Sequence, residues 1–477
     1  MSATDFHDTY FFSSEHARQV ASQQNKKNNG YWLQCCYYDG PKLEVDLPNL
    51  IHLPIEGMVD ALGNGTNRIP TRISLDGIDC TEEQRDQIRA DMALQLAAAK
   101  ALRLRKNQQH YEQLRNAKLD FSDPLRIWLH AHVNTTVMFN IIQCLYDACR
   151  AAGLDTQFEV KYGVEDYQCY KNMAIFNPHV TFSINHFNNT HISEDVFNFV
   201  WFQDAMFAIE LPENQYIRRR DIVYSLTESI KKHLADRGIE SLSQNFCVDT
   251  KKYRARKNIN RADKIVFIGS SYRPQWDLIA WGIKHEVTSI LFSDLLENGY
   301  WDRDKIGAIK HEYKINDDIL GRIKNYVERD LVLKQILHDY PEYRLEIYGR
   351  NWAIDPVLNS ACQGPLSFGE DVSKIYNGAR YALVLGGYVL QQRTLEAAAS
   401  GSTPIILDVR SGLDTAPEDN IDESAIFFRR PAEFGACLEK ASPKVVSPII
   451  EGLSYADLVT KMLRQIMNSM STRRHNS

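Results

Sequence analysis

Residues 391–406 read QQRTLEAAASGSTPII, a stretch that combines the end of a loop, a short helix and a buried strand. The pattern predicts a helix that begins near Arg393 and ends at Gly401, because glycine commonly terminates helices. The apolar run after Thr403 predicts a buried strand. A helix followed at once by a buried strand is the repeating unit of an α/β protein with a parallel sheet.

The same alternation of strand and helix extends outward from this stretch in two successive blocks. The basic segment from Lys251 to Arg261 separates the blocks and suits a crossing between domains. The pattern therefore predicts an α/β fold with two Rossmann-like domains, residues 121–258 and 259–450. The predicted strands cover residues 126–132, 157–161, 179–184, 197–203, 221–226 and 246–248 in the first block, and 264–269, 344–349, 381–387, 403–407 and 424–428 in the second. Within residues 451–477 we expect a helix that crosses back to the first domain, and then a flexible tail.

Residues 1–120 differ from both blocks, and we expect an N-terminal, mostly helical extension. Thr81 and Gln84 have the spacing of a capping box, which predicts a long helix over residues 81–118. Residues 13–30 are polar and predict a mobile segment. The extension could pack against the rest of the chain, or it could bind an acceptor or a partner; the sequence leaves both open.

The composition is that of a soluble globular protein. Of 477 residues, 44% are hydrophobic and 24% are charged, and the net charge of −6 lacks the concentrated basic surface that nucleic acid binding needs. We find no secretory signal and no run that predicts a membrane span. The nine cysteines show no paired spacing, which favours reduced thiols in a cytoplasmic protein.

Two turns of the second block have the composition of a phosphate site. Ligands of parallel sheets bind beyond the carboxyl ends of strands, where Gly269, Ser270 and Arg273 follow a predicted strand. The helix beginning near Arg393 offers backbone N–H groups to a pyrophosphate, and Glu396 could accept hydrogen bonds from a ribose. Alternatively, Glu396 only complements the helix dipole and Arg393 is a surface cation.

The second block resembles the spore-coat-maturation-type glycosyltransferases (glycosyl transferases group 1-like), and Arg393 to Gly401 resembles the donor-site signature of GT-B glycosyltransferases. The matching pieces are residues 267–270, 348–349, 376–380 and 393–401 in the second block, and 200–204, 221–225 and the strand near Phe246 in the first. Together they span about residues 124–428, roughly two-thirds of the chain. The resemblance implies a GT-B fold, in which two Rossmann-like domains face a cleft.

The resemblance also implies a role for each matching residue. Glu396 would bind the donor ribose, while Arg393, Thr394 and the backbone near Gln392 would hold the diphosphate. The remaining donor residues would be Gly269, Ser270 and Arg273 on the sugar phosphate, and Tyr348 and Gly349 near the nucleobase. One departure concerns the related group with a Glu-x7-Glu motif: Tyr388 stands eight residues before Glu396, where that motif has its first carboxylate. The departure leaves retaining or inverting stereochemistry open.

An inverting transfer needs a base that deprotonates the acceptor hydroxyl. His130, His132 and Asp204 stand at predicted strand ends of the first block and are the candidates. Each could instead have only a structural role.

We expect no metal site. His130 and His132 have no third ligand at a suitable spacing, and Asp302 and Asp304, although of Asp-x-Asp form, read as part of a solvated surface.

The sequence thus predicts a metal-independent glycosyltransferase without a cofactor. It would move a sugar from a UDP-, GDP- or dTDP-sugar, the nucleotide being open, to a hydroxyl of a protein, glycan or small acceptor. Two alternatives remain: an inactive GT-B protein that binds a nucleotide-sugar or a partner, and another nucleotide-using α/β enzyme such as a sugar epimerase of GT-B shape.

Overall fold

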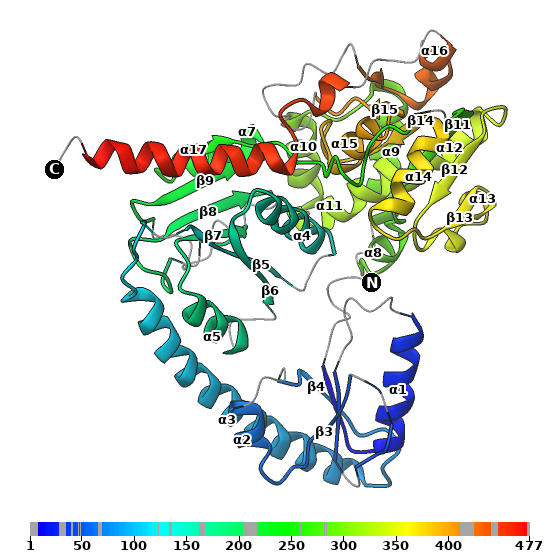
Figure 1. Cartoon of the computed structure of the whole chain (residues 1–477). Helices are drawn as coiled ribbons and strands as arrows, with labels where there is room; N and C mark the ends of the chain where they lie inside the picture. Colours follow the sequence, from blue (N-terminus) through cyan, green and yellow to red (C-terminus); the bar gives the residue numbers. More distant parts are fainter. Residues whose placement is uncertain are drawn as a thin grey trace. The chain divides into compact units, whose positions relative to one another are not determined.

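A computed structural model of the chain describes residues 8–27, 35–39, 42–45, 47, 49–64, 69–122, 124–132, 136–161, 167–187, 189–203, 217–257, 259–280, 282, 284–410, 424–439 and 447–474 (Figure 1). The chain divides into two compact units. The first comprises residues 1–200 and 207–222, and the second residues 201–206 and 223–477.

The N-terminal region contains a small parallel sheet with the strand order β3-β2-β1-β4. Its strands are β1 (Thr9–Phe11), β2 (Cys36–Tyr38), β3 (Leu50–His52) and β4 (Arg72–Ser74), and its helices are α1 (Ser14–Lys27), α2 (Met58–Asn64) and α3 (Glu82–Arg115). Most of its regular structure is helical, as expected. The strand-like apolar pieces between Tyr31 and Leu53 include β2 and β3, whereas the sequence did not predict β1 or β4.

Helix α1 occupies residues 14–27 of the segment that we expected to be mobile, and residues 28–30 lie outside the described residues. Ala17 and Ala21 are buried in a small apolar cluster with Phe11, Cys36 and Tyr38. Two small residues four positions apart give this polar segment one apolar side, and the strands beside it supply the surface that side covers.

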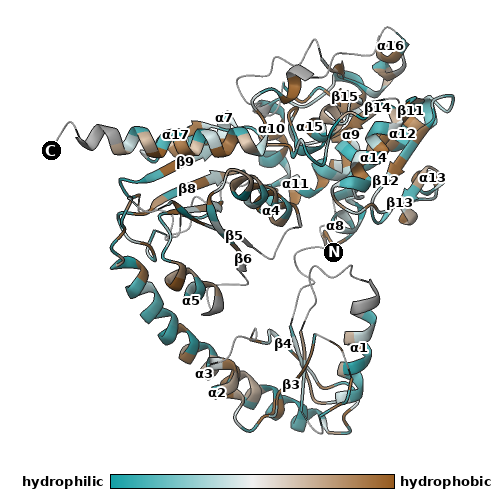
Figure 2. Cartoon of the chain, viewed as in Figure 1, coloured by the Kyte–Doolittle hydropathy of each residue, from teal (hydrophilic) through white to brown (hydrophobic). Residues whose placement is uncertain are grey.

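Helix α3 begins with the predicted capping box. The Thr81 side chain accepts a hydrogen bond from the Gln84 N–H at 3.3 Å, and the Gln84 side chain accepts one from the Thr81 N–H at 2.9 Å. The helix is mainly hydrophilic along its length (Figure 2), and only a few of its side chains are buried. Met92 and Ala99 belong to the apolar cluster of the small sheet, whereas Tyr111 packs with α5 (Tyr167–Phe176).

The second sheet has six strands in the order β10-β9-β8-β7-β5-β6. They are β5 (Arg126–His132), β6 (Asp155–Lys161), β7 (Val180–Ile184), β8 (Phe197–Phe202), β9 (Asp221–Ser225) and β10 (Leu242–Ser243), with helices α4 (Thr136–Ala151) and α7 (Glu228–Ala235) in addition to α5. We predicted residues 246–248 as the last strand of this sheet, but the last strand is β10. Val248 instead forms an isolated bridge with Ser454, so its backbone pairs outside the sheet.

The third sheet has six parallel strands in the order β13-β12-β11-β14-β15-β16. They are β11 (Ala262–Ile268), β12 (Leu345–Tyr348), β13 (Cys362–Gly364), β14 (Ala379–Val384), β15 (Thr403–Leu407) and β16 (Ile426–Phe428). The accompanying helices are α8 (Arg273–Asp277), α9 (Lys284–Asn298), α10 (Arg303–Tyr313), α11 (Asp317–Tyr326), α12 (Val332–Asp339), α13 (Pro356–Ser360), α14 (Glu370–Gly378), α15 (Gln392–Ala399) and α16 (Phe434–Glu439), with a π-helical turn over Val327–Leu331.

The last helix, α17 (Tyr455–Arg474), lies along β9 and β10. The Tyr224 hydroxyl donates a hydrogen bond to Gln465 Oε1 at 2.5 Å, and Lys461 Nζ donates to the Ser243 carbonyl at 3.0 Å.

None of the helices in the described ranges has both the length and the apolar run that a membrane crossing needs. The two six-stranded sheets with their helices confirm the predicted α/β class with two Rossmann-like domains.

Candidate functional site

The order of the third sheet marks the place where a ligand is expected. From the central strand β11 the chain moves to β12 and β13 on one side, and it then returns to β14, β15 and β16 on the other. The connections that leave β11 and β14 therefore diverge at their carboxyl ends. In parallel sheets such a topological switch point opens the crevice in which ligands bind.

The loop after β11 is fixed by the loop after the neighbouring strand β12. The Gly269 N–H donates to the Tyr348 carbonyl at 2.9 Å, and the Ser271 N–H donates to the Arg350 carbonyl at 3.0 Å. The Ser270 hydroxyl oxygen accepts a hydrogen bond from the Arg350 N–H at 3.3 Å. The predicted residues Gly269, Ser270 and Gly349 thus lie together.

Two other residues predicted for this side of the site have structural partners. The Tyr348 hydroxyl donates to Glu346 Oε2 at 2.9 Å, which turns it back along its own strand. The Arg273 Nε donates to Asp277 at 2.8 Å, and its guanidinium lies 4.8 Å from the ring centroid of Trp276. Arg273 therefore stabilises α8 in this structure, and only the backbone at residue 348 contributes to the loop after β11.

The loop after β14 contains a pair of glycines that the sequence analysis did not single out. Gly386 and Gly387 both have left-handed backbones, with φ of +79° and +72°. Gln391 Nε2 donates to the Gly386 carbonyl at 2.7 Å, and the Thr394 hydroxyl donates to the Val389 carbonyl at 2.7 Å. The predicted strand over residues 381–387 included both glycines, whereas β14 ends at Val384. Two adjacent glycines at the end of a buried apolar run were the signal that could have identified this loop.

Helix α15 follows this loop and begins, within the described part of the chain, without a side-chain cap. Gln392 Nε2 donates to Glu396 Oε1 at 3.2 Å, and Arg393 Nη1 forms an ion pair with Glu396 Oε2. The Glu396 side chain has no exposed surface, whereas the Arg393 side chain is 33% exposed. Gln392 Oε1 is buried and has no hydrogen-bond partner among the described residues. The start of α15 therefore presents backbone N–H groups and one partly exposed cation.

Two tyrosines lie in the electrostatic surroundings of this ion pair. Burial, and then the negative charge of Glu396, raise the pKa of Tyr253 above its ordinary value. Burial also raises the pKa of Tyr376, where Arg393 and Glu396 act in opposite directions. Both phenols therefore stay neutral at ordinary pH, and Arg393 is the cation that an anion would meet beside α15.

A single π-helical turn, Val327–Leu331, contacts both loops. Glu328 accepts a hydrogen bond from the Gly387 N–H at 3.3 Å, and Asp330 accepts one from the Tyr272 N–H at 3.0 Å. Burial raises the pKa of Asp330 to about 6, although hydrogen bonds from Ser271 and Tyr272 lower it in part. Neither carboxylate stands out in the sequence, since both lie inside a helical pattern.

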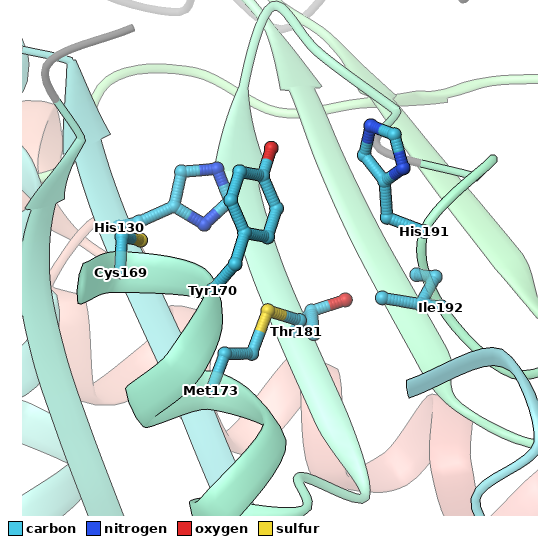
Figure 3. A pocket seen from close by; sticks show the side chains of 7 residues that line it. All are labelled: His130, Cys169, Tyr170, Met173, Thr181, His191 and Ile192. Atoms are coloured by element: carbon cyan, nitrogen blue, oxygen red, sulfur yellow. The ribbon is translucent and has the colours of Figure 1, made fainter. Parts of the chain in front are cut away.

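The predicted base candidates lie in or beside the second sheet. His130 on β5 is 5% exposed and lines a pocket with Cys169 and Tyr170 of α5 and with His191 (Figure 3). His132 ends β5, but its side chain lies outside the described part of the structure, as does the whole of Asp204. The structure thus gives surroundings only for His130, which is covered by α5.

Within the described residues, no three His, Cys, Asp or Glu side chains lie together as metal ligands would. Asp302, of the Asp-x-Asp sequence, caps α10 by accepting a hydrogen bond from the Lys305 N–H at 2.7 Å.

Comparisons with solved structures found glycosyltransferases at low similarity. The glycosyltransferase from Rickettsia africae ESF-5 is 9% identical with a TM-score of 0.41, over 72% of this chain and 97% of that one. AviGT4, involved in avilamycin A biosynthesis, is 11% identical with a TM-score of 0.38, over 73% and 98%. SnogD from Streptomyces nogalater is 9% identical with a TM-score of 0.34, over 72% and 99%. At these TM-scores the likenesses bear on neither fold nor function.

A search of curated proteins found no match. A protein-family comparison, in contrast, matches the part of the chain that begins within the π-helical turn, at Arg329, and that holds the glycine pair and α15. Residues 329–450 match the model of a family described as glycosyl transferase-like, which confirms for this segment the resemblance predicted from the sequence.

Proposed function

We propose that the chain is a glycosyltransferase that moves a sugar from a nucleotide-sugar to a hydroxyl of a protein, glycan or small acceptor. The observation that carries the proposal is the family match over residues 329–450, because the matched segment contains the start of α15 and the loop before it. The topological switch between β11 and β14 supports a ligand at the same edge of the sheet.

The donor diphosphate is proposed to bind at the start of α15. Backbone N–H groups at a helix N-terminus attract anions, and the loop with Gly386 and Gly387 leads directly into that end. Arg393 would donate charge-assisted hydrogen bonds to the diphosphate. These groups would stabilise the negative charge that develops on the leaving diphosphate without a metal ion.

Glu396 is proposed to bind the donor ribose after a local rearrangement. In the structure both of its oxygens are occupied, one by Gln392 and one by Arg393. If the diphosphate draws Arg393 toward itself, Glu396 Oε2 becomes able to accept a ribose hydroxyl. Thr394 would act through the backbone, since its hydroxyl holds the Val389 carbonyl.

The loops after β11 and β12 and a base complete the proposed site. Gly269 and Ser270 would approach the sugar phosphate, and the backbone of Tyr348 and Gly349 would lie near the nucleobase. The acceptor would be deprotonated by one of the three base candidates, His132, Asp204 or His130. Arg273 would contribute to the donor only by leaving Asp277.

A donor screen tests the proposal. The full chain would be mixed with UDP-, GDP- and dTDP-sugars, and its melting temperature and the release of nucleoside diphosphate would be measured. We expect one nucleotide class to stabilise the protein by RT ln(1 + [L]/Kd) and to be released as the diphosphate when an acceptor is present. The Arg393→Ala variant should lose most of this stabilisation.

Other results would point to other functions. Stabilisation by a donor with no diphosphate released, in the presence of protein, glycan and small acceptors, would favour a binding protein over an enzyme. A changed sugar that remains attached to its nucleotide would favour an epimerase. Absence of any effect from all three donor classes would overturn the proposal.

A further inference from the structure

A π-helical turn interrupts the helical segment between β11 and β12. It covers Val327–Leu331 and lies between α11 and α12. Such insertions are rare and frequently occur at functional sites, because they cost regular hydrogen bonding and redirect side chains. Two acidic residues stand in this turn, Glu328 and Asp330, and each is only 2% exposed.

Glu328 holds the loop after β14. Its Oε1 accepts a hydrogen bond from the Tyr300 hydroxyl at 2.6 Å, and its Oε2 accepts the Gly387 N–H at 3.3 Å. A Cβ atom added at Gly386 would lie 3.1 Å from the same Oε2, so the carboxylate sits directly against the turn of the loop.

Asp330 holds the loop after β11. One of its oxygens accepts a hydrogen bond from the Ser271 hydroxyl, and the other accepts the Tyr272 N–H at 3.0 Å. Arg329, between the two acids, donates from Nη1 to the Ser270 carbonyl at 3.0 Å, and its guanidinium lies 4.2 Å from the Tyr272 ring centroid. Three consecutive residues of one turn therefore contact the loops that follow two neighbouring strands.

We propose that Glu328 and Asp330 are positioning residues for the donor site, which together fix the spacing of its two loops. The inference rests on the proposed function. Burying two carboxylates is costly unless hydrogen bonds compensate them, and here the compensating donors come from these loops and from Tyr300. A loop that binds an anion through its backbone must be held in place before the ligand arrives, and a displacement of about 1 Å can cost about 100-fold in rate.

Isothermal titration of the full chain with UDP, GDP, dTDP and inorganic pyrophosphate tests the inference. Glu328→Ala and Asp330→Ala should each weaken the binding of the preferred nucleotide by about 10-fold to 100-fold. Glu328→Gln and Asp330→Asn should lose less, because each keeps one acceptor oxygen. An equal loss for pyrophosphate would assign the effect to the loops rather than to recognition of the nucleobase.

A buried acid outside the proposed donor site serves as the matched control. Asp294 accepts hydrogen bonds from Asn298 of the same helix, α9, and from Lys305 of α10. Asp294→Asn should therefore bind nucleotide like the wild type. If this control weakens binding as much as the Glu328 and Asp330 variants, the positioning role is overturned.

Hydrogen exchange without ligand provides an independent measurement that does not depend on the nucleotide. Glu328→Gln should speed exchange in residues 385–391, and Asp330→Asn in residues 269–273, with β15 unchanged. Unaltered exchange together with unaltered affinity would overturn the inference while the proposed function stands. A wild-type chain that binds none of the four probes would overturn the proposed function and, with it, the donor role of both acids.

Discussion

The Gly349 backbone lies against the Gly269 carbonyl so closely that a Cβ atom at position 349 would stand 2.0 Å from the Gly269 oxygen. Gly349 also has a φ of +146°, which side-chain-bearing residues rarely adopt. The end of β12 thus admits only glycine, and this contact fixes how the loops after β11 and β12 approach each other.

Gly349→Ala should therefore destabilise the protein strongly. The obstacle is backbone rather than a flexible side chain, so we expect a loss of about 3 kcal/mol or more in the free energy of unfolding. Chemical denaturation monitored by circular dichroism would measure it. Gly364→Ala is the matched control, because Gly364 has a φ of +94° but an added Cβ atom there would meet nothing within 4 Å. Equal losses in the two variants would show that strain in φ, and not the contact with Gly269, determines the cost.

Asp330 should make stability depend on pH in a defined direction. Its pKa is about 6 in the folded chain against an ordinary 3.8, so between these values the folded state binds more protons than the unfolded state. The contribution of Asp330 to the free energy of unfolding of the wild type therefore falls as pH rises through this window. The Asp330→Asn variant lacks this titration, and its stability relative to wild type should rise by about 2 kcal/mol between pH 4.5 and 7.5.

Glu346→Gln provides a control of opposite sign. Burial raises the pKa of Glu346, but hydrogen bonds from Lys264 and Tyr348 outweigh it, so the pKa lies below the ordinary value. The contribution of Glu346 to stability is fully present above its pKa in the unfolded chain, and it is lost as pH falls through its pKa in the folded chain. The variant should therefore not gain stability relative to wild type as pH rises. A flat difference for Asp330→Asn over the same range would contradict the buried, raised-pKa account of Asp330.

Substitutions of Arg393 and Glu396 should affect the binding of different ligands if the ion pair between them opens when a nucleotide binds. Arg393→Ala removes the cation and should weaken nucleoside diphosphate and pyrophosphate alike, by about 10-fold to 100-fold. Glu396→Gln keeps a side chain of the same shape and should weaken the nucleoside diphosphate but not pyrophosphate, which has no ribose. Calorimetric titration with both ligands would measure this. If Glu396→Gln weakened both equally, Glu396 would only orient Arg393.

The sequence predicted β11, β15 and α15 closely, because their patterns are local. A buried apolar run defines each strand, and Gly401, with a φ of +82°, ends the helix as expected. The Ser402 N–H donates to the Ala397 carbonyl at 3.0 Å and the Gly401 N–H to the Ala398 carbonyl at 2.9 Å, the pairing that a left-handed glycine permits after a helix.

The features missed by the sequence analysis depend on contacts between distant segments. Tyr348 stands on a predicted strand, but the sequence does not show where its hydroxyl points. In the structure the hydroxyl donates to Glu346 and so turns away from the strand end, and Glu346 also pairs with Lys264 at 2.7 Å. Likewise, Glu328 and Asp330 gain a role only because Gly387 and Tyr272 meet them. The periodicity of the sequence does not predict such pairs of distant residues.

His130 and His132 should give different results, although they stand two residues apart on one strand. His130 is buried against α5, so His130→Ala should chiefly lower stability, by about 1–3 kcal/mol, with the transfer rate of the folded protein little changed. His132→Ala, if His132 is the base, should lower the transfer rate by about 100-fold to 10,000-fold while donor binding stays normal.

The comparison of these two variants needs rate and binding measured on the same folded fraction, because a destabilised protein also loses apparent rate. Donor affinity by titration and melting temperature provide that correction for each variant. Asp204→Asn completes the set, since Asp204 is the other candidate base. Suppose that His132→Ala and Asp204→Asn both keep a normal transfer rate, while His130→Ala loses much of its rate at unchanged stability. This result would make His130 the base, because only direct proton transfer by His130 would then explain a loss of rate without a loss of folding.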